Sequence, residues 1–335
     1  MKMHELIQIM QKAQEDHAIY GVSLAVAAKG KVQTFYDGVQ GSGSDSIPLK
    51  PGMLYDLASL TKVVGTATRI FQLLAEKKLA LNDQAGQFLT GLKYPRITIE
   101  QLLLHDSGLP ADLPNASALD KTSLIQAVKN ASLKSQPSTR MVYSDLGFIL
   151  LGWIIQQIDG SLSQSLETNI FKPLEMQDTG FNPTQYPKRL YVPTEYQPER
   201  GGIIRGQVHD EKANILGGVS GHAGLFSTLD DLVHFVQMLL NNGSYQGSEV
   251  LSPSIFELLK KHCLYGRTLG WKLWGQPDDP DFKVWHTGFT GTSIALNLTK
   301  KTAFVCLTNR VYPSRANTRW LSWRLQAIKQ FYRAF

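Results

Sequence analysis

Apolar residues alternate with polar ones near both ends of the chain, which is the pattern of half-buried β-strands. Five segments have this pattern or run continuously apolar: 21–28, 32–36, 282–285, 293–298 and 303–308. Tight turns are expected at 29–31 and 299–302, between consecutive segments. We therefore predict an antiparallel sheet to which both ends of the chain contribute strands.

Apolar residues at helical spacing dominate the middle of the chain and recur at its two extremities. Helices are predicted in six segments: 6–13, 59–78, 99–104, 146–158, 232–240 and 321–335. Thr228, three residues before Asp231, is expected to cap the helix at 232–240. Residues 182–221 predict an extended covering loop, and residues 41–46 predict a flexible one.

Strands at the ends and helices between them predict an α/β (α+β) fold, in which an antiparallel sheet is flanked by helices and carries an inserted, mostly helical subdomain. We expect the α/β subdomain at about residues 1–80 and 246–335, and the helical subdomain at about 81–245. The 335 residues are enough for one large domain or two intimate subdomains.

The composition is that of a globular protein, with 43% hydrophobic, 10% aromatic and 19% charged residues. No run approaches the eighteen or so apolar residues of a membrane span. Polar residues interrupt the first twelve positions, which argues against a secretory signal. We therefore expect a cytoplasmic protein, unless a leader is missing from this sequence. Cys263 and Cys306 are too few for a disulfide framework or a metal site.

The net charge of +6 reflects an excess of basic residues near the C-terminus. They are Arg310, Arg315, Arg319, Arg324, Lys329 and Arg333. Apolar residues at helical spacing stand among them, so we interpret these side chains as the solvated face of a packed helix. A nucleic-acid surface would need interleaved aromatic residues as well. We predict no nucleic-acid partner and leave the oligomeric state open.

Ser59 and Lys62 are three residues apart, which puts both side chains on one face of a helical turn. Such a lysine can take the proton of the serine if burial or a cationic neighbour lowers the lysine pKa. The pair is then a nucleophile that needs no histidine. An isolated match of this kind is weak evidence, because a capping serine and a surface lysine give the same spacing.

Two later motifs add chemistry to this pair. Tyr143-Ser144-Asp145 stands just before the predicted helix at 146–158, and a tyrosine there can act as a general base if nearby cations lower its pKa. His286-Thr287-Gly288 stands on a predicted strand and is followed by Phe289. In this order and spacing, the three motifs resemble those of the serine β-lactamase and penicillin-binding protein superfamily, in the branch of class C β-lactamases and related esterases and peptidases.

Segments 102–110 and 217–228 are similar to two further parts of that family, so the resemblance covers about residues 15–335. It implies a β-lactamase/transpeptidase-like fold and a serine hydrolase without cofactor or metal, whose partner is a small ester, peptide or β-lactam. The catalytic residues that it implies are Ser59, Lys62 and Tyr143. The substrate-binding residues that it implies are Asp145, His286, Thr287, Gly288 and Phe289. The backbone N–H groups of Ser59 and Phe289 would form the oxyanion hole.

Two positions depart from the usual motifs. His286 stands where many members have lysine, and a histidine is mostly neutral at pH 7. Asp145 stands where many have asparagine; it accepts but cannot donate hydrogen bonds, and it would keep Lys62 protonated. Arg310 is a further substrate-binding candidate, which would supply the missing cation if the last strand brings it to the cleft.

These departures favour a carboxylesterase or a D-amino-acid peptidase. The alternatives are a β-lactamase with weak penicillin or cephalosporin hydrolysis, and a non-catalytic module that binds peptidoglycan fragments. His105 and His222 lie in glycine-flanked turns and are expected to be structural. His209-Asp210-Glu211 lacks a partner histidine at metal-ligand spacing, so we expect it to line the cleft rather than to bind a metal.

Overall fold

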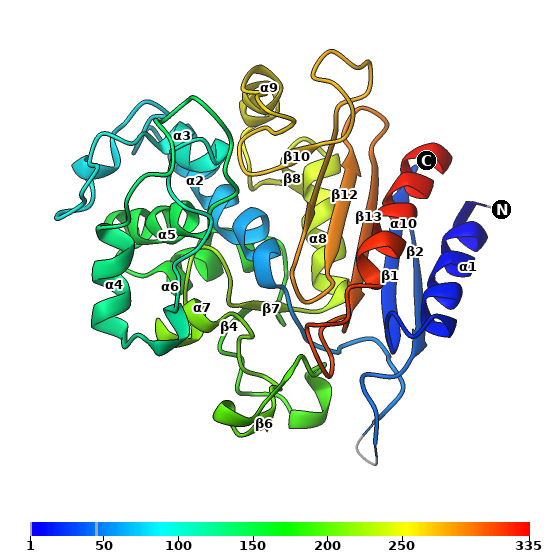
Figure 1. Cartoon of the computed structure of the whole chain (residues 1–335). Helices are drawn as coiled ribbons and strands as arrows, with labels where there is room; N and C mark the ends of the chain where they lie inside the picture. The colour runs from blue at the N-terminus through cyan, green and yellow to red at the C-terminus, as the bar shows by residue number, and fades with distance from the viewer. Residues whose placement is uncertain (1, 44–45) are drawn as a thin grey trace.

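A six-stranded antiparallel sheet joins the two ends of the chain in the computed structural model, which describes residues 2–43 and 46–335 (Figure 1). Its strands follow the order β10-β11-β12-β13-β1-β2. Their bounds are Gly21–Ala28 (β1), Lys31–Gly38 (β2), Lys272–Leu273 (β10), Lys283–Thr287 (β11), Ser293–Asn297 (β12) and Thr302–Thr308 (β13). The two ends of the chain meet where β1 pairs with β13, with Leu24 opposite Cys306.

All five predicted strands are present, and the predicted fold class is confirmed. The sheet also contains β10, whose two residues are too few to show a period in the sequence. The loop predicted at 41–46 includes residues 44 and 45, which lie outside the described residues.

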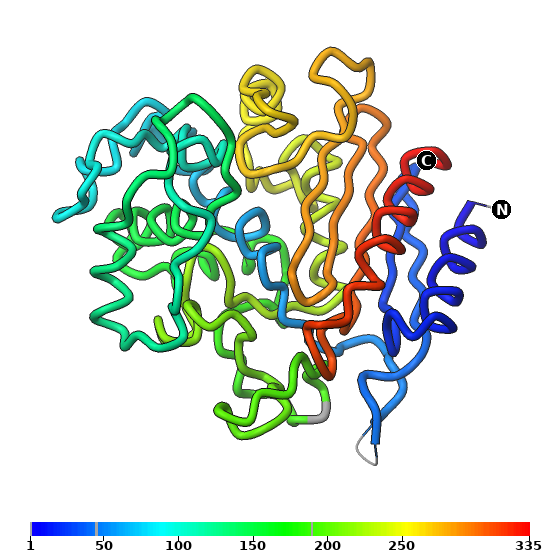
Figure 2. The backbone as a smooth tube through the Cα atoms, in the orientation of Figure 1, coloured from blue at the N-terminus to red at the C-terminus, as the bar shows by residue number. Residues whose placement is uncertain are grey.

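Helices cover both faces of this sheet (Figures 1 and 2). The terminal helices α1 (Lys2–Glu15) and α10 (Trp320–Ala334) lie side by side on one face, where alternate β1 residues such as Leu24 and Val26 join their core. The intervening alanines of β1 face the core of α8 (Leu229–Leu240) and the remaining helices. The period of two in β1 thus separates two hydrophobic cores.

The helical part of the molecule surrounds a buried helix, α5 (Asp145–Asp159), which begins at the N-cap Ser144. The α-helices in contact with it are α2 (Thr68–Ala75), α3 (Ile99–Leu104) and α6 (Leu162–Leu166). The other α-helices of the middle of the chain are α4 (Lys121–Lys129), α7 (Glu211–Ile215) and α9 (Ser254–Lys261). Shorter turns are η1 (Ala58–Leu60), η2 (Lys62–Ala67), η3 (Ala85–Gln87), η4 (Ala116–Ala118), η5 (Glu167–Phe171), η6 (Lys188–Leu190) and η7 (Pro198–Arg200).

Short strands connect these helices. They are β3 (Tyr55–Asp56), β4 (Gly180–Phe181) and β7 (Leu225–Ser227) in one sheet, and the hairpins β5 (Tyr196–Gln197) with β6 (Gly202–Ile203) and β8 (Ser244–Tyr245) with β9 (Ser248–Glu249). The segment 182–221, predicted as one extended loop, therefore contains short regular elements, including α7. The division of the chain near residues 80 and 245 stays a prediction, although α8, inside the range assigned to the helical part, packs on β13 and β1.

The helix predicted from residue 59 to 78 is not continuous. The chain forms the 3-10 turn η1, then the π-helical turn η2, and only then α2, which ends at Ala75. The hydroxyl of Thr68 donates to the carbonyl of Val63, five residues earlier, at 2.7 Å. This contact spans the wider turn, and such π-turns are frequent at functional sites.

No single helix among the described residues has the length and apolar character needed to cross a bilayer. By those two criteria alone, one bent pair qualifies: Asp145–Asp159 with Leu162–Phe171.

Arg69, whose side chain is 2% exposed, ties α2 to α5 through charge pairs. Its Nε lies 2.8 Å from Asp159 Oδ2, and its Nη1 lies 2.6 Å from Glu76 Oε1. We expect Arg69→Met to lower the free energy of unfolding by about 3 kcal/mol, because it leaves Asp159 without its buried partner. Urea unfolding of the variant measures this loss.

Lys78→Met is the matched control, because Lys78 pairs with Glu76 at the surface and exposed pairs contribute about 0–1 kcal/mol. Burial raises the pKa values of Asp159 and Glu76, but Arg69 outweighs it and both pKa values are lowered. The stabilisation is therefore present above about pH 4, the usual carboxyl range, and is lost as the pH falls through the lowered pKa values. Equal losses in both variants at pH 7 would contradict this assignment.

Candidate active site

Ser59 lies in η1, where the chain passes from the sheet to the helical part (Figure 1). The residue before it, Ala58, has a φ of 46°, in the left-handed region that residues with a side chain rarely adopt. The amide of Ala58 donates to Asp56 Oδ1 at 2.8 Å, and Asp56 is itself buried. These contacts hold a strained backbone directly before Ser59.

The ammonium group of Lys62 is fully buried among oxygen acceptors. Nζ lies 2.9 Å from Ser59 Oγ, 3.0 Å from the carbonyl oxygen of His222 and 2.9 Å from Asp145 Oδ1. Burial lowers the pKa of this lysine, but Asp145 and Tyr143 outweigh burial, and the pKa of Lys62 is raised. Lys62 therefore holds its proton at neutral pH. The lowered pKa that a lysine base requires is not found in this resting arrangement.

The turn at 105–111 fixes the loop that carries Tyr143 and Asp145. Nδ1 of His105 accepts from the amide of Ser144 at 3.0 Å, and the amide of Asp145 donates to the carbonyl of Ala111 at 3.0 Å. The rings of His105 and Tyr143 lie 4.6 Å apart. His105 and His222 are buried and hydrogen-bonded, and the ring of His222 bonds Asp210 and Ser220. That their roles are structural stays a prediction.

Two cations flank the ring of Tyr143. Nζ of Lys62 and the guanidinium carbon of Arg267 each lie 5.1 Å from the ring centroid. Distances of this order allow cation–π attraction, which is strengthened where water is excluded. Tyr143 therefore contacts both the lysine that contacts Ser59 and an arginine from a distant part of the chain.

The end of β11 closes against the segment before Ser59. The hydroxyls of Thr290 and Thr292 donate to the carbonyls of Asp56 and Leu57 at 2.7 and 3.1 Å. A Cβ atom on Gly288 would lie 2.5 Å from the carbonyl oxygen of Leu57, so this close approach requires glycine. The motif glycine thus brings β11 next to the nucleophile segment.

His286 and Thr287 occupy β11, as predicted, on the wall beside Ser59. Neither ring nitrogen of the buried His286 has a hydrogen-bond partner among the described residues. Burial, with Arg267 and Lys62 nearby, lowers the pKa of His286 well below its usual value, so the ring is neutral.

Two arginines fix the peptide units around Phe289. Nη1 of Arg324 donates to the carbonyl of Gly288 at 3.0 Å, and Nε of Arg310 donates to the carbonyl of Phe289 at 2.9 Å. In a trans peptide unit C=O and N–H point in opposite directions, so the first bond also orients the N–H of Phe289. Among the described residues, the amides of Ser59 and Phe289 donate to no protein acceptor, which leaves both for a ligand.

Arg310 lies at the wall beside Ser59, but it is buried, and its Nε and Nη1 donate to the carbonyls of Phe289 and Asn317. These bonds position the backbone. A direct contact of Arg310 with substrate stays a prediction. The interpretation of the C-terminal arginines as a solvated face is wrong for Arg310 and Arg324, because both line the cleft.

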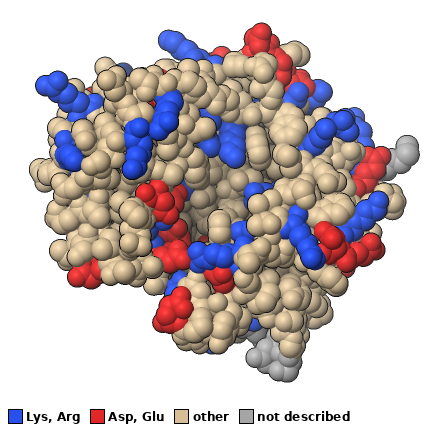
Figure 3. Space-filling model, viewed as in Figure 1, with Lys and Arg blue, Asp and Glu red and all other residues tan. Residues whose placement is uncertain are grey.

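Two cavities meet at Ser59. The first, of about 210 Å³, has walls of both charges that include Asp112, Asp210, Glu211, Lys212 and Arg315; we call it the mixed pocket. The second, of about 610 Å³, is called the basic pocket; its charged lining residues are Arg267, Lys272, Arg310, Arg315 and Arg324. In Figure 3, basic side chains border the hollow in the middle of the face, and acidic side chains gather along one side of it.

A chain of ionisable side chains runs along the wall of the mixed pocket. Nζ of Lys212 lies 3.3 Å from Asp145 Oδ2 and 3.4 Å from Asp210 Oδ2, and Nε2 of His222 lies 2.7 Å from Asp210 Oδ1. Asp145, Asp210 and His222 are close enough together to be tested as metal ligands. A metal ion there would meet the ammonium groups of Lys62 and Lys212, which already neutralise these carboxylates. The donor set does not fit a metal.

His209, Asp210 and Glu211 all line the mixed pocket, as the sequence analysis expected. His209 bonds Glu195 at 2.9 Å, and its ring stacks on Phe289 at 5.5 Å. Sequence reasoning missed Arg267, Lys272 and Lys212, none of which belongs to a recognised motif.

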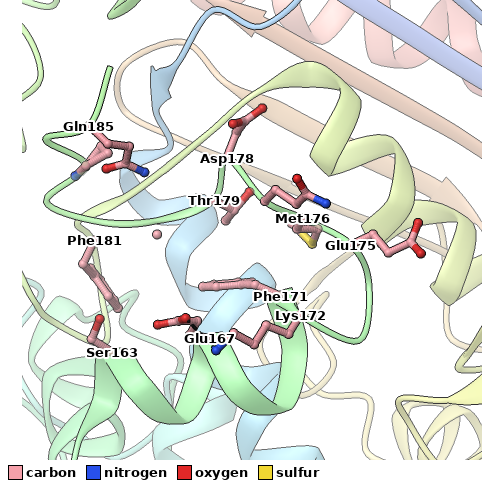
Figure 4. A pocket seen from close by; sticks show the side chains of 13 residues that line it. Ser163, Glu167, Phe171, Lys172, Glu175, Met176, Asp178, Thr179, Phe181 and Gln185 are labelled. Atoms are coloured by element: carbon pink, nitrogen blue, oxygen red, sulfur yellow. Dashed lines mark ion pairs between the residues drawn. The ribbon is translucent and has the colours of Figure 1, made fainter. Parts of the chain in front are cut away.

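A separate hollow of about 440 Å³ lies away from Ser59, between η5 and residues 175–185 (Figure 4). Phe171 and Lys172 project from the helical segment, and Phe181 and Gln185 lie across the hollow. Thr179 in its wall bonds Ser227 and Asp231 at 2.7 Å each. This hollow shares no lining residue with the two pockets at Ser59.

Comparisons with known proteins place this chain in a family. The sequence matches the family profile described as Beta-lactamase over residues 6–328. A candidate D-alanyl-D-alanine carboxypeptidase of Salmonella enteritidis PT4 is 32% identical, over 79% of this chain and 71% of that protein.

Solved structures share the fold. EstCE1, a hydrolase with promiscuous acyltransferase activity, has a TM-score of 0.76 at 19% identity, over 98% of each chain. A class C β-lactamase from Rhodobacter sphaeroides has a TM-score of 0.76 at 20% identity, over 97% of this chain and 99% of that chain. The family resemblance seen in the motifs is confirmed: the chain is a hydrolase that belongs to the β-lactamase family, within the superfamily of serine β-lactamases and penicillin-binding proteins.

Proposed function

We propose that Ser59 attacks the carbonyl of an ester or amide and forms an acyl-enzyme, which water then hydrolyses. The observation that carries this proposal is the 2.9 Å contact of Lys62 Nζ with Ser59 Oγ, made by an ammonium group that Asp145 anchors on its other side. A nucleophile, a proton carrier and an orienting carboxylate in direct contact are the parts that covalent catalysis needs.

The protonated state of Lys62 constrains the proton route. An ammonium group has no acceptor site, so the resting Lys62 can only donate to Ser59 Oγ. The proton of Ser59 must therefore go to Tyr143, or to a Lys62 that has first lost a proton. We assign acylation to the two residues acting together, and we assign activation of the deacylating water to Tyr143.

The oxyanion hole in this proposal consists of the N–H groups of Ser59 and Phe289. Their lack of protein acceptors supports the assignment, as does the pair of arginine bonds that fixes the Phe289 backbone. Loss of one such donor typically costs about 3 kcal/mol of transition-state stabilisation.

The substrate that we favour is a small ester or a D-amino-acid peptide. The name of the Salmonella relative supports the peptide, and that of EstCE1 supports acyl transfer. The neutral His286 in place of a lysine makes β-lactam hydrolysis the second candidate. A cytoplasmic location stays part of the proposal.

A substrate panel tests the proposal: short p-nitrophenyl esters, nitrocefin and peptides that end in D-Ala-D-Ala. Turnover of esters or peptides above nitrocefin supports the favoured class, and the reverse order supports a β-lactamase. A fluorescent phosphonate and a fluorescent penicillin provide a second readout. A folded protein that neither reacts with a probe nor turns over a substrate would be the non-catalytic binding module.

Asp145→Asn is expected to shift the rising limb of the pH profile of kcat/KM to lower pH. Asp145 raises the pKa of Lys62, so its neutralisation lets Lys62 lose a proton at a lower pH. The profile of kcat/KM reports the groups of the free enzyme. Asp112→Asn is the control, because Asp112 contacts Lys212 rather than Lys62. The rising limb of the Asp112→Asn profile should therefore move less. Superimposable profiles for wild type and Asp145→Asn would contradict the proton route.

A further inference from the structure

Three cations of the basic pocket have no carboxylate partner among the described residues. Of the five that line it, Arg315 pairs with Glu195 and Glu211, and Arg310 donates to backbone carbonyls. The remaining three form no ion pair with any described residue: Arg267, Lys272 and Arg324. No aspartate or glutamate lines this pocket.

Arg267 shows most clearly the lack of partners for these cations. The residue is 3% exposed, and neither Nε nor Nη1 has a hydrogen-bond partner among the described residues. Its guanidinium carbon lies 5.1 Å from the ring centroid of Tyr143. Buried polar groups in proteins are almost always hydrogen-bonded, so these donors at the cavity wall are available to an acceptor that a ligand supplies.

The other two cations are only partly satisfied. Nζ of Lys272 lies 4.6 Å from the ring centroid of Trp285, and Arg324 uses one N–H group on the carbonyl of Gly288. Burial, with Arg267 and Arg324 nearby, lowers the pKa of Lys272 to about 8. Burial, with Arg310 nearby, lowers the pKa of Arg324 to about 10. Gathered positive charge without counter-charge is unfavourable, and an anion in the pocket would relieve it.

We propose that the basic pocket binds a part of the substrate that carries two negative charges, such as a dicarboxylate or a phosphate monoester. One carboxylate would neutralise one of three unpaired cations, whereas a dianion engages at least two. The pocket opens onto Ser59, so the dianionic group adjoins the bond that is cleaved. That last point rests on the proposed function; the binding of a dianion does not.

Calorimetric titration of the Ser59→Ala variant tests the binding without any need for hydrolysis. Benzoate, isophthalate and phenyl phosphate, titrated at one ionic strength, differ in charge on a common ring. We expect isophthalate or phenyl phosphate to bind at least about tenfold more tightly than benzoate, and the tighter of the two identifies the dianion. Equal affinities, or no binding of any of the three, would overturn the proposal.

Lys272→Gln in the same background should weaken the dianions more than benzoate and so reduce their advantage. Arg267→Gln is a second variant with the same expected result. Lys260→Gln, an exposed residue on α9 outside the pocket, removes the same charge and should leave the advantage intact. If the dianions still bind more tightly than benzoate by an unchanged factor in both pocket variants, the proposal is overturned.

Competition in the wild type locates the binding relative to Ser59. The tighter dianion should inhibit hydrolysis of the best substrate of the panel competitively, and a non-competitive pattern would place the dianion elsewhere and overturn the assignment. If Ser59 is not the nucleophile, the titrations of the variants still stand. The two failures are therefore distinguishable.

Discussion

Ser59→Ala is expected to lower kcat/KM by about 10⁴-fold or more on any ester or amide that the wild type hydrolyses, because it removes the nucleophile. The remaining rate would come from the oxyanion hole and binding alone. The fold should be unaffected, since Lys62 keeps its contacts with Asp145 and the carbonyl of His222. Steady-state kinetics with the best panel substrate measures the loss, and urea unfolding checks the fold.

Covalent labelling provides the sharper control. A phosphonate probe should add its mass to the peptide that contains Ser59 in the wild type and should fail to label Ser59→Ala. Ser163→Ala, a serine in the wall of the remote hollow, should label and turn over like the wild type. Labelling that persists in Ser59→Ala, or moves to another serine of a folded protein, would refute the assigned nucleophile.

The sequence predicts most of the fold because most strands of the main sheet are long enough to show an alternating or continuously apolar pattern. In β1, Leu24 and Val26 alternate with alanines, so the period of two follows directly from two different cores on the two faces. The two-residue strand β10 has no period to detect. The break between η1, η2 and α2 was also unpredictable, since it depends on local contacts such as that of the Thr68 hydroxyl with Val63.

Some parts of the candidate site could likewise be predicted from the sequence, and others could not. Ser59 and Lys62 are one helical turn apart, so their spacing in the sequence is sufficient to predict contact. Arg267 and Lys272 are paired in a β-bridge, but Arg324 comes from the distant helix α10, and only the folding of α10 onto this wall brings the three together. A single basic residue carries no motif. The positive charge of the cleft therefore could not be predicted from the sequence, although its nucleophile could.

Lys62→Met is expected to lower kcat/KM by about 10²- to 10⁴-fold, the usual contribution of a positioned proton-transfer group. Methionine fills the buried volume without a charge, and Asp145 keeps Lys212 as a partner at 3.3 Å. Kinetics on the panel substrates measures the loss, and urea unfolding shows whether the variant remains folded. Lys212→Met, which removes the other buried ammonium of the cluster but does not contact Ser59, should lose much less activity.

Lys62→Arg separates the two ways in which Lys62 can act. Arginine keeps the positive charge beside Ser59, but it does not release its proton in proteins. If Lys62 takes part in proton transfer, Lys62→Arg should be about as inactive as Lys62→Met. If Lys62 supplied only positive charge, the arginine variant would keep much of the activity, and Tyr143 alone would have to accept the proton of Ser59. The pH profile of the activity that remains in Lys62→Arg provides a further check. If Lys62 transfers a proton in the wild type, the rising limb that it contributes to the profile should be absent from the variant.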